Sequence, residues 1–380
     1  MKYITDVPAD ELAGKYVLVR AGLDVPLDEH GNVADLFRVR RAAETLIYLK
    51  ERGAKIIVLS HIGRDPSTTN EPVARALKAH VPVFYVSDIL GPQAQHARTV
   101  MKPGDVLLLE NLRTDPREIE NDPDFAKELA ALGDVYVDDA FSVAHRAHAS
   151  IVGIPAHLPS YAGILMREEV ERLDQARAPI SPSVAILGGA KFETKEPLIK
   201  LLLATYDHVL VAGALANDIF RARGLPIGTS LVSEGLPAPD ILKNPKLLTP
   251  IDVTIERPDR QAHVKKIADV AADERIVDMG PDSLALVAPF IAEAKFILWN
   301  GPTGMFEHGY GMWTQRLAEI IAQSDAPATV GGGDTVAAIE EAHVQMGEHT
   351  FLSTGGGAML EYLLKGTLPG IEALDTPHNS

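Results

Sequence analysis

Basic side chains recur in the first half of the chain, each near the start of a helix-like stretch or after an apolar run. They are Arg38, His61, Arg64, Arg113 and Arg146. If the apolar runs are parallel strands, their carboxyl ends meet at one edge and gather these side chains there. Each arginine alone would more often be a surface ion-pair residue. Because they share one place in the pattern, they predict a basic pocket for a small anionic substrate.

Glycine clusters follow apolar runs in the second half of the chain. They are Gly188-Gly189-Ala190, Gly331-Gly332-Gly333-Asp334-Thr335 and Gly355-Gly356-Gly357-Ala358. Glycine at a strand end lets backbone N–H groups of the next helix approach phosphate oxygens. One such turn would be weak evidence, since glycine also serves tight turns that bind nothing. Three of them predict a nucleotide site, although the P-loop and Rossmann fingerprints are both lacking.

Charged residues accompany two of these clusters. Lys191 and Lys195 stand four residues apart, so on a helix they would share one face near its positive end, where they favour a multiply charged anion. A solvated lysine face is the alternative. Asp334 is a candidate for Mg²⁺ bound to phosphates, because one or two carboxylates plus phosphate oxygens often hold that ion. An isolated carboxylate there would more often be a helix N-cap, a role that Thr335 could also fill.

The elements that must position these residues are short runs rich in Val, Ile and Leu, separated by amphipathic stretches such as 40–52 and 124–132. The alternation predicts βαβ units around parallel sheets buried on both faces. In the first half the runs are 16–19, 55–59, 83–86, 106–109 and 135–137. In the second half they are 184–187, 208–211, 275–277, 296–299, 328–330 and 350–352, which predict a second parallel sheet. The fold class is therefore α/β with two Rossmann-like lobes.

Length and composition agree with two lobes. A chain of 380 residues exceeds the size at which one core usually stops growing, about 250 to 300 residues. It has no apolar stretch of membrane-spanning length and no signal-type apolar start, so we expect a soluble, cytoplasmic protein. The absence of cysteine excludes disulfides, thiolate metal sites and cysteine nucleophiles and leaves the redox context open. The net charge of -16 repels nucleic acid and anionic membranes. An anionic substrate therefore needs a local basic pocket.

Residues 164–178, ended by Pro179, combine helical spacing of apolar residues with a charged face. They predict a helix that joins the lobes, and a surface helix that belongs to one lobe is equally compatible with the spacing. This divides the chain into lobes 1–163 and 179–358. We expect the last ten or so residues, ending in Thr376 to Ser380, to be loose.

A nucleotide site in one lobe and a small-anion site in the other suit phosphoryl transfer, which depends on positioning and charge neutralisation. The chain resembles the phosphoglycerate kinase family from about residue 16 to residue 374. The matching blocks, in one order, are 17–20 with 25–26, 60–64, 110–113, 139–141 with 144–150, 187–191, 299–302 with 304 and 306–307, 330–334 and 353–358.

The resemblance implies reversible transfer between the acyl phosphate of 1,3-bisphosphoglycerate and MgADP, giving 3-phosphoglycerate and MgATP. It also implies an N-terminal glycerate lobe, a C-terminal nucleotide lobe, hinge closure, and a segment 359–380 that returns to the first lobe. Matching positions make Arg38, His61, Arg64, Arg113 and Arg146 the glycerate-phosphate contacts, and Arg38 and Lys191 the catalytic residues. Nucleotide contacts would come from Gly189, Ala190, Lys191, Lys195, Gly213, Asn300, Pro302, Glu307, Gly331, Gly332, Gly333, Asp334 and Thr335, with Asp334 on Mg²⁺. We expect a monomer.

The chain departs from the family at Gly22 and Asp24, where the family usually has an acidic residue and an asparagine. Residues two apart on an extended strand point to the same face, so we expect Asp24 to supply the missing carboxylate and bind the substrate. Alternatively, Asp24 only caps the turn before Pro26. Segments 212–217 and 308–313 also depart from the pattern near the nucleoside. The competing functions are a two-lobed acid kinase with another acceptor and a non-catalytic nucleotide-binding paralogue.

Overall fold

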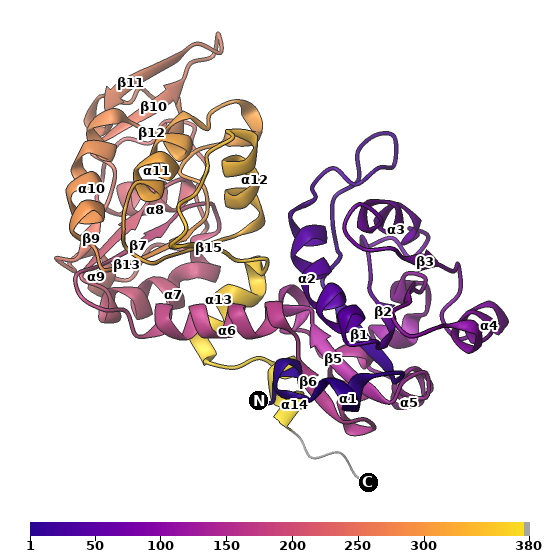
Figure 1. The fold of residues 1–380 in the computed structure, drawn as a ribbon. Coiled ribbons are helices and arrows are strands. Elements are labelled where there is room, and N and C mark those ends of the chain that lie inside the picture. Colours follow the sequence, from indigo (N-terminus) through magenta and orange to yellow (C-terminus); the bar gives the residue numbers. More distant parts are fainter. Residues whose placement is uncertain (376–380) are drawn as a thin grey trace. The chain divides into compact units, whose positions relative to one another are not determined.

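The computed structural model describes residues 1–375, which fold into two compact units (Figure 1). Of the described residues, unit 1 comprises Met1–Glu171 and 367–375, and unit 2 comprises Arg172–Gly366. The division falls inside helix α6 (Ile164–Arg177). Residues 376–380, part of the end that the sequence predicts to be loose, lie outside the described residues.

Unit 1 is built on a six-stranded sheet in the order β3-β4-β2-β1-β5-β6, with all neighbouring strands parallel. The strands are β1 (Tyr16–Ala21), β2 (Lys55–Leu59), β3 (Phe84–Tyr85), β4 (Val106–Leu108), β5 (Val135–Asp139) and β6 (Ser160–Ala162). The central strands are buried almost throughout, as expected for a parallel sheet covered on both faces. The five predicted runs of the first half are therefore confirmed as strands of one sheet.

Helices cover this sheet. They are α1 (Ala9–Leu12), α2 (Phe37–Glu51), α3 (Glu71–Leu77), α4 (Pro92–Val100), α5 (Pro123–Ala130) and α14 (Pro369–Asp375), with short helical segments η1 (Ile4–Asp6), η2 (Leu112–Thr114), η3 (Pro116–Glu118), η4 (Phe141–Val143), η5 (Ala149–Gly153) and η6 (Ile154–Ala156). On α2, Val39, Leu46 and Leu49 repeat on one face and join Val17 and Val19 of β1 in one buried cluster. This packing fixes the start of α2, which carries Arg38, to the sheet.

Helix α14 comes from the end of the chain but belongs to unit 1. The backbone N–H of Gly370 donates to the carbonyl of Ala144 at 2.8 Å. A Cβ at Gly370 would lie 2.9 Å from the Ile151 Cγ2 and 3.2 Å from the Ala144 Cα, so the close approach requires glycine. The contact secures the loop that leads into Arg146.

Unit 2 contains a second six-stranded parallel sheet in the order β15-β14-β13-β7-β8-β9. Its strands are β7 (Ser183–Leu187), β8 (His208–Val211), β9 (Leu247–Leu248), β13 (Phe296–Asn300), β14 (Ala328–Gly331) and β15 (Thr350–Leu352). The fold class, two parallel sheets flanked by helices, is confirmed.

One predicted strand belongs elsewhere. Residues 275–277 lie in β12 (Arg275–Met279), which pairs antiparallel with β10 (Asp252–Glu256), and β10 pairs antiparallel with β11 (Ala262–Lys266). The prediction that 275–277 joins the parallel sheet was therefore wrong. The physical reason is that β12 is buried along almost its whole length, so its composition matches that of a parallel strand.

The helices of unit 2 are α7 (Phe192–Thr205), α8 (Ala214–Ala222), α9 (Pro239–Leu242), α10 (Pro281–Glu293), α11 (Met312–Ala322), α12 (Gly333–Glu341) and α13 (Gly356–Lys365), with η7 (Ile267–Asp269) and η8 (Phe306–His308). Trp299 and Ile297 of β13 lie at the centre of the core with Val184 and Ile186 of β7. Across residues 1–375, no helix combines the length and the apolar character needed to cross a membrane.

Candidate active site

The predicted substrate-site residues of unit 1 follow neighbouring strands of one sheet. Asp24 follows β1, His61 and Arg64 follow β2, Arg113 lies in η2 after β4, and Arg146 lies beyond η4 after β5. Because these strands are adjacent and parallel, their following loops share one edge of the sheet, as the sequence predicts. Arg38 lies in the first turn of α2 rather than before the helix.

Asp24 has a different setting from the one expected. Strand β1 ends at Ala21, so Gly22 and Asp24 are not on an extended strand and the argument from alternating faces was wrong. Instead, the Asp24 Oδ1 accepts a hydrogen bond from the Gly63 N–H at 2.9 Å, and its backbone carbonyl accepts one from Arg38. Burial alone would raise the pKa of Asp24, but His61, the Gly63 N–H and the Arg38 charge lower it to about 2. The carboxylate is therefore ionised and anchored.

His61 is buried and neutral. Burial and the charges of Arg20 and Arg113 lower the pKa of its imidazole to about 3, against the opposing influence of Asp24. The positive charge of the predicted basic pocket would therefore come from its arginines, and His61 adds none near neutral pH. The sequence pattern had grouped His61 with the cations because burial is invisible in the motif.

Arg113 and Arg146 are close enough to affect each other. Burial and the charge of Arg146 lower the pKa of Arg113, and the Arg113 Nη1 donates to the carbonyl of Gly63. Within residues 1–375 neither guanidinium forms an ion pair, so two like charges lie near each other where an anion would be favoured. Arg64 is exposed, and within residues 1–375 its side chain makes no hydrogen bond or ion pair.

A buried polar network beneath this site was missed by sequence reasoning. The Arg20 Nε donates to the Ser150 Oγ at 2.9 Å, and the Ser150 Oγ donates to the Glu118 Oε1 at 2.6 Å. The N–H of Ser150 also donates to the Glu118 Oε2 at 2.9 Å. All three side chains are fully buried. The available signal was an arginine within the apolar run Val17-Leu18-Val19-Arg20-Ala21, because a charge on a buried strand needs partners.

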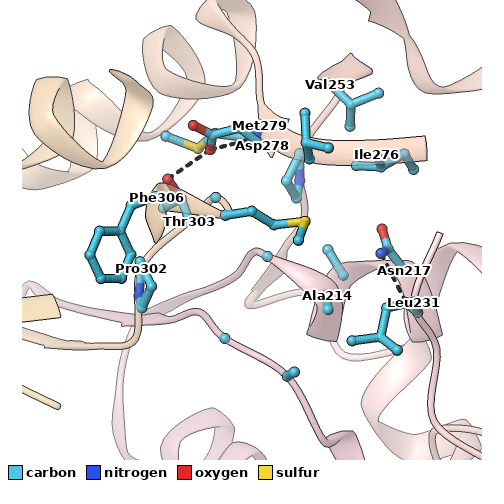
Figure 2. A pocket seen from close by; sticks show the side chains of 18 of the residues that line it. Ala214, Asn217, Leu231, Val253, Ile276, Asp278, Met279, Pro302, Thr303 and Phe306 are labelled. Atoms are coloured by element: carbon cyan, nitrogen blue, oxygen red, sulfur yellow. Dashed lines mark hydrogen bonds between the residues drawn. The ribbon is translucent and has the colours of Figure 1, made fainter. Parts of the chain in front are cut away.

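The nucleotide candidates of unit 2 surround a cavity of about 250 Å³ (Figure 2). Of the predicted residues, Gly189, Ala190, Gly213, Pro302, Glu307 and Asp334 line it. Its apolar walls include Leu231, Val253, Ile276 and Phe306, and Figure 2 shows several of these side chains around the hollow. The sequence missed Leu231, Val253 and Ile276 because they come from β10, β12 and the loop after α8, which no glycine motif marks, whereas Phe306 lies in η8 within the matching block 306–307.

The other nucleotide candidates are close in sequence to residues that line this cavity, but they do not line it themselves. They are Lys191, Lys195, Asn300, Gly331, Gly332, Gly333 and Thr335. The Asn300 side chain is buried and its Nδ2 lies 3.7 Å from the Met359 Sδ of α13. A Cβ at Gly331 would lie 2.0 Å from the same sulfur atom. These contacts give both residues a packing role within unit 2.

The two lysines do not share a helix face, contrary to the expectation. Lys191 precedes α7 with a left-handed φ of 64°, and it is exposed. Lys195 lies within the first turns of α7, where its Nζ donates to the carbonyl of Gly188 at 2.7 Å. Burial lowers the pKa of Lys195 to about 8, although Asp334 opposes this shift.

Asp334 is exposed in the first turn of α12, and Gly332 occupies the N-cap position. The Thr335 Oγ1 accepts a hydrogen bond from the Gly301 N–H at 2.8 Å, so it does not cap the helix. The N-cap interpretation is therefore wrong for both residues. Within residues 1–375 no group of three or more His, Asp or Glu side chains could hold a metal ion. A single exposed carboxylate at the glycine-rich start of a helix fits the expectation of Mg²⁺ that arrives with a nucleotide.

The family model described as phosphoglycerate kinase matches residues 4–366. The chain belongs to the phosphoglycerate kinase family. Among curated relatives, the phosphoglycerate kinase of Moorella thermoacetica is 42% identical over 96% of this chain and 97% of its own length. That of Chloroflexus aggregans is 41% identical over 98% of both chains.

Solved structures of phosphoglycerate kinases are similar to this chain over nearly its whole length. The Coxiella burnetii structure has a TM-score of 0.80 at 34% identity, and the Pyrococcus horikoshii OT3 structure has a TM-score of 0.87 at 29% identity, each covering 98% of both chains. The chain is thus a phosphotransferase with phosphoglycerate kinase activity, acting with a carboxyl group as acceptor. The resemblance described from the motifs is confirmed.

Proposed function

We propose that unit 1 binds 3-phosphoglycerate or 1,3-bisphosphoglycerate and that unit 2 binds MgADP or MgATP. In the forward direction the bond between phosphorus and the acyl oxygen breaks and leaves a carboxylate. A new bond forms between phosphorus and a terminal oxygen of ADP. The observation that carries this proposal is the pair Arg113 and Arg146, two cations in loops at one edge of the sheet, where burial and the charge of Arg146 lower the pKa of Arg113.

Arg38, Arg64, Arg113 and Arg146 are proposed to neutralise the phosphate and carboxylate of the glycerate. Arg64 suits this role because it is exposed beside the anchored Gly63. Arg113 is held by the Gly63 carbonyl, so its remaining donors are preorganised. Arg38 is also proposed to stabilise the transferring phosphoryl group together with Lys191.

Asp24 is proposed to accept a hydrogen bond from the glycerate hydroxyl. Its carboxylate is ionised, anchored by the Gly63 N–H, and more than a third of the side chain is exposed. Repulsion between this carboxylate and that of the substrate is offset by the surrounding arginines. These contacts support a role for Asp24 beyond turn capping, and Gly22 contributes no side chain.

In unit 2 the cavity walls are proposed to hold the nucleoside, with Glu307 on the ribose and Pro302 on the base or sugar. The N-termini of α12 and α13, whose N-cap residues are Gly332 and Gly355, would supply N–H groups to phosphates. Lys195 would contact nucleotide phosphates. Asp334 would hold the Mg²⁺ that accompanies the nucleotide and neutralises phosphate charge. We also propose a monomer that acts in the cytoplasm.

The test of the acceptor is an assay with 3-phosphoglycerate and MgATP, coupled to detection of the acyl phosphate, on the wild type and Asp24→Ala. Turnover that requires 3-phosphoglycerate supports the proposal. Loss of the hydroxyl contact in Asp24→Ala should raise the KM for 3-phosphoglycerate by roughly tenfold, about 1.4 kcal/mol, and leave the KM for ATP unchanged. Turnover with another carboxylic acid only would show that the acceptor has changed, and equal small changes in both KM values would assign Asp24 to structure.

A further inference from the structure

The hydrogen bond between Arg20 and His61 has only one possible direction. The Arg20 Nη2 lies 2.6 Å from the His61 Nδ1, and both side chains are almost completely inaccessible. A guanidinium has donors and no acceptor, so the Nδ1 must accept. A neutral imidazole that accepts at Nδ1 carries its proton on Nε2.

The proton on Nε2 faces the carboxylate of Asp24. The distance from the His61 Nε2 to the Asp24 Oδ2 is 3.5 Å, and no described residue offers this buried nitrogen a closer hydrogen-bond partner. An ionised carboxylate can only accept. With the proton on Nε2, His61 accepts from Arg20 and presents its N–H to the Asp24 carboxylate across 3.5 Å, a contact longer than an ordinary hydrogen bond.

We propose that Arg20 is a positioning residue that fixes His61 in the Nε2–H tautomer and thereby orients the Asp24 carboxylate in the glycerate site. The functional part of this inference rests on the proposed role of Asp24. In this arrangement His61 acts on Asp24 as a neutral donor and contributes no charge to the basic pocket.

Arg20 is well placed to hold this state. Its Nε donates to the Ser150 Oγ at 2.9 Å and its Nη1 donates to the carbonyl of Ala21 at 2.7 Å, so the guanidinium is fixed at three points with His61 as the third. A fixed planar donor allows the imidazole ring little freedom to turn over. Ser150 in turn is bonded to the buried Glu118, which balances the charge of Arg20.

Burial and the cations that face His61 favour the neutral ring. The charged groups that face it are Arg20 from β1, Arg113 from η2 and Asp24 from the loop after β1. Burial and the two cations lower the pKa of His61 to about 3, whereas Asp24 acts in the opposite direction. We therefore expect no titration of His61 between about pH 5 and pH 8, the range in which an unperturbed histidine changes charge.

The first test leaves the molecule intact. Long-range ¹H–¹⁵N correlation spectra of enzyme labelled with ¹⁵N-histidine report which ring nitrogen carries the proton, and His61→Gln identifies the signal of His61. The expected result is a protonated Nε2, an unprotonated Nδ1 and constant shifts from about pH 5 to pH 8. A proton on Nδ1, or a charge change in that range, would overturn the proposal. This readout does not depend on which acceptor the enzyme uses.

The second test separates positioning from charge balance. Arg20→Lys keeps a buried cation that can only donate, whereas Arg20→Met has similar length and no donor. We expect Arg20→Lys to retain the Nε2–H tautomer. In Arg20→Met the His61 signal should move toward a mixture of tautomers, with KM for 3-phosphoglycerate raised about tenfold and KM for ATP unchanged.

The control is Arg98→Met, which removes another arginine of unit 1 that bonds the Leu132 carbonyl and stacks on Tyr16. It should lower stability and leave the His61 signal unchanged. An unaltered His61 signal in Arg20→Met would contradict the proposal. So would an equal rise in the KM for 3-phosphoglycerate in Arg20→Met and Arg20→Lys. If Arg20→Met does not fold, the wild-type spectrum still decides the tautomer.

Discussion

At the scale of single residues, burial decides what each charged group can do. Lys191 and Lys195 are four positions apart, yet Lys191 is exposed before α7 and Lys195 is bonded to the Gly188 carbonyl. Desolvation disfavours the charged form of a lysine, and burial lowers the pKa of Lys195 to about 8, a pH at which the enzyme can be assayed. We therefore expect Lys195 to affect the pH dependence of nucleotide binding and Lys191 to affect the rate of transfer.

The prediction for Lys195 concerns pH. Because burial lowers its pKa to about 8, Lys195 is protonated below that pH and loses its charge as the pH rises through it. The KM for MgATP should therefore increase above about pH 8, since a cation near the phosphates is lost. Steady-state kinetics between about pH 6.5 and pH 9.5 measure this, with Lys195→Arg as the control that keeps its charge. The same profile in both enzymes would assign the titration to another group.

The prediction for Lys191 concerns the rate. An exposed cation after the Gly188-Gly189-Ala190 turn is free to follow charge that moves between substrates. Lys191→Ala should lower kcat on the order of 10²- to 10³-fold with a smaller change in nucleotide affinity. Single-turnover kinetics and nucleotide titration separate the two effects. A normal kcat with only a raised nucleotide KM would show that Lys191 binds without assisting transfer.

At the scale of elements, glycines let the loops after β7, β8 and β13 pack against one another. The N–H of Gly188 donates to the Asn300 carbonyl at 2.9 Å, and that of Gly189 donates to the Pro302 carbonyl at 3.1 Å. A Cβ at Gly188 would lie 2.0 Å from the Pro302 carbonyl oxygen, which is backbone and cannot move aside. The first glycine cluster is thus required for packing beside the cavity, whatever it binds.

Gly188→Ala should therefore destabilise unit 2 by about 1 to 3 kcal/mol, as overpacking usually does, and weaken nucleotide binding with it. Urea unfolding followed by Trp299 and Trp313 fluorescence measures the loss. Gly333→Ala is the matched control for stability, because a Cβ there meets nothing within 4 Å and its φ is not positive. Equal stability of the two variants would show that the loops can separate at no cost.

At the scale of the whole molecule, a net charge of -16 coexists with a local arginine cluster in unit 1. Attraction of a small anion to such a cluster is screened over about 8 Å at physiological ionic strength. The affinity for 3-phosphoglycerate should therefore fall as potassium chloride increases, and less steeply in Arg64→Gln, which lacks one exposed cation. Equilibrium titrations at several salt concentrations test this, and an affinity independent of salt would mean that the arginines do not act as one pocket.

The sequence by itself determined the family, the two α/β lobes and which residues follow which strands, because buried parallel strands and glycine turns have composition and spacing that can be read locally. Tertiary structure decided the rest. In the folded chain β1 ends at Ala21, and Asp24 lies in the following loop, where its carboxylate contacts Gly63 and His61. Tertiary structure also placed 275–277 in an antiparallel sheet, supplied the apolar walls of the cavity and made His61 neutral. The physical reason is that strand pairing, burial and the direction of a hydrogen bond depend on partners distant along the chain, such as Arg20 and His61, which are separated by 41 positions.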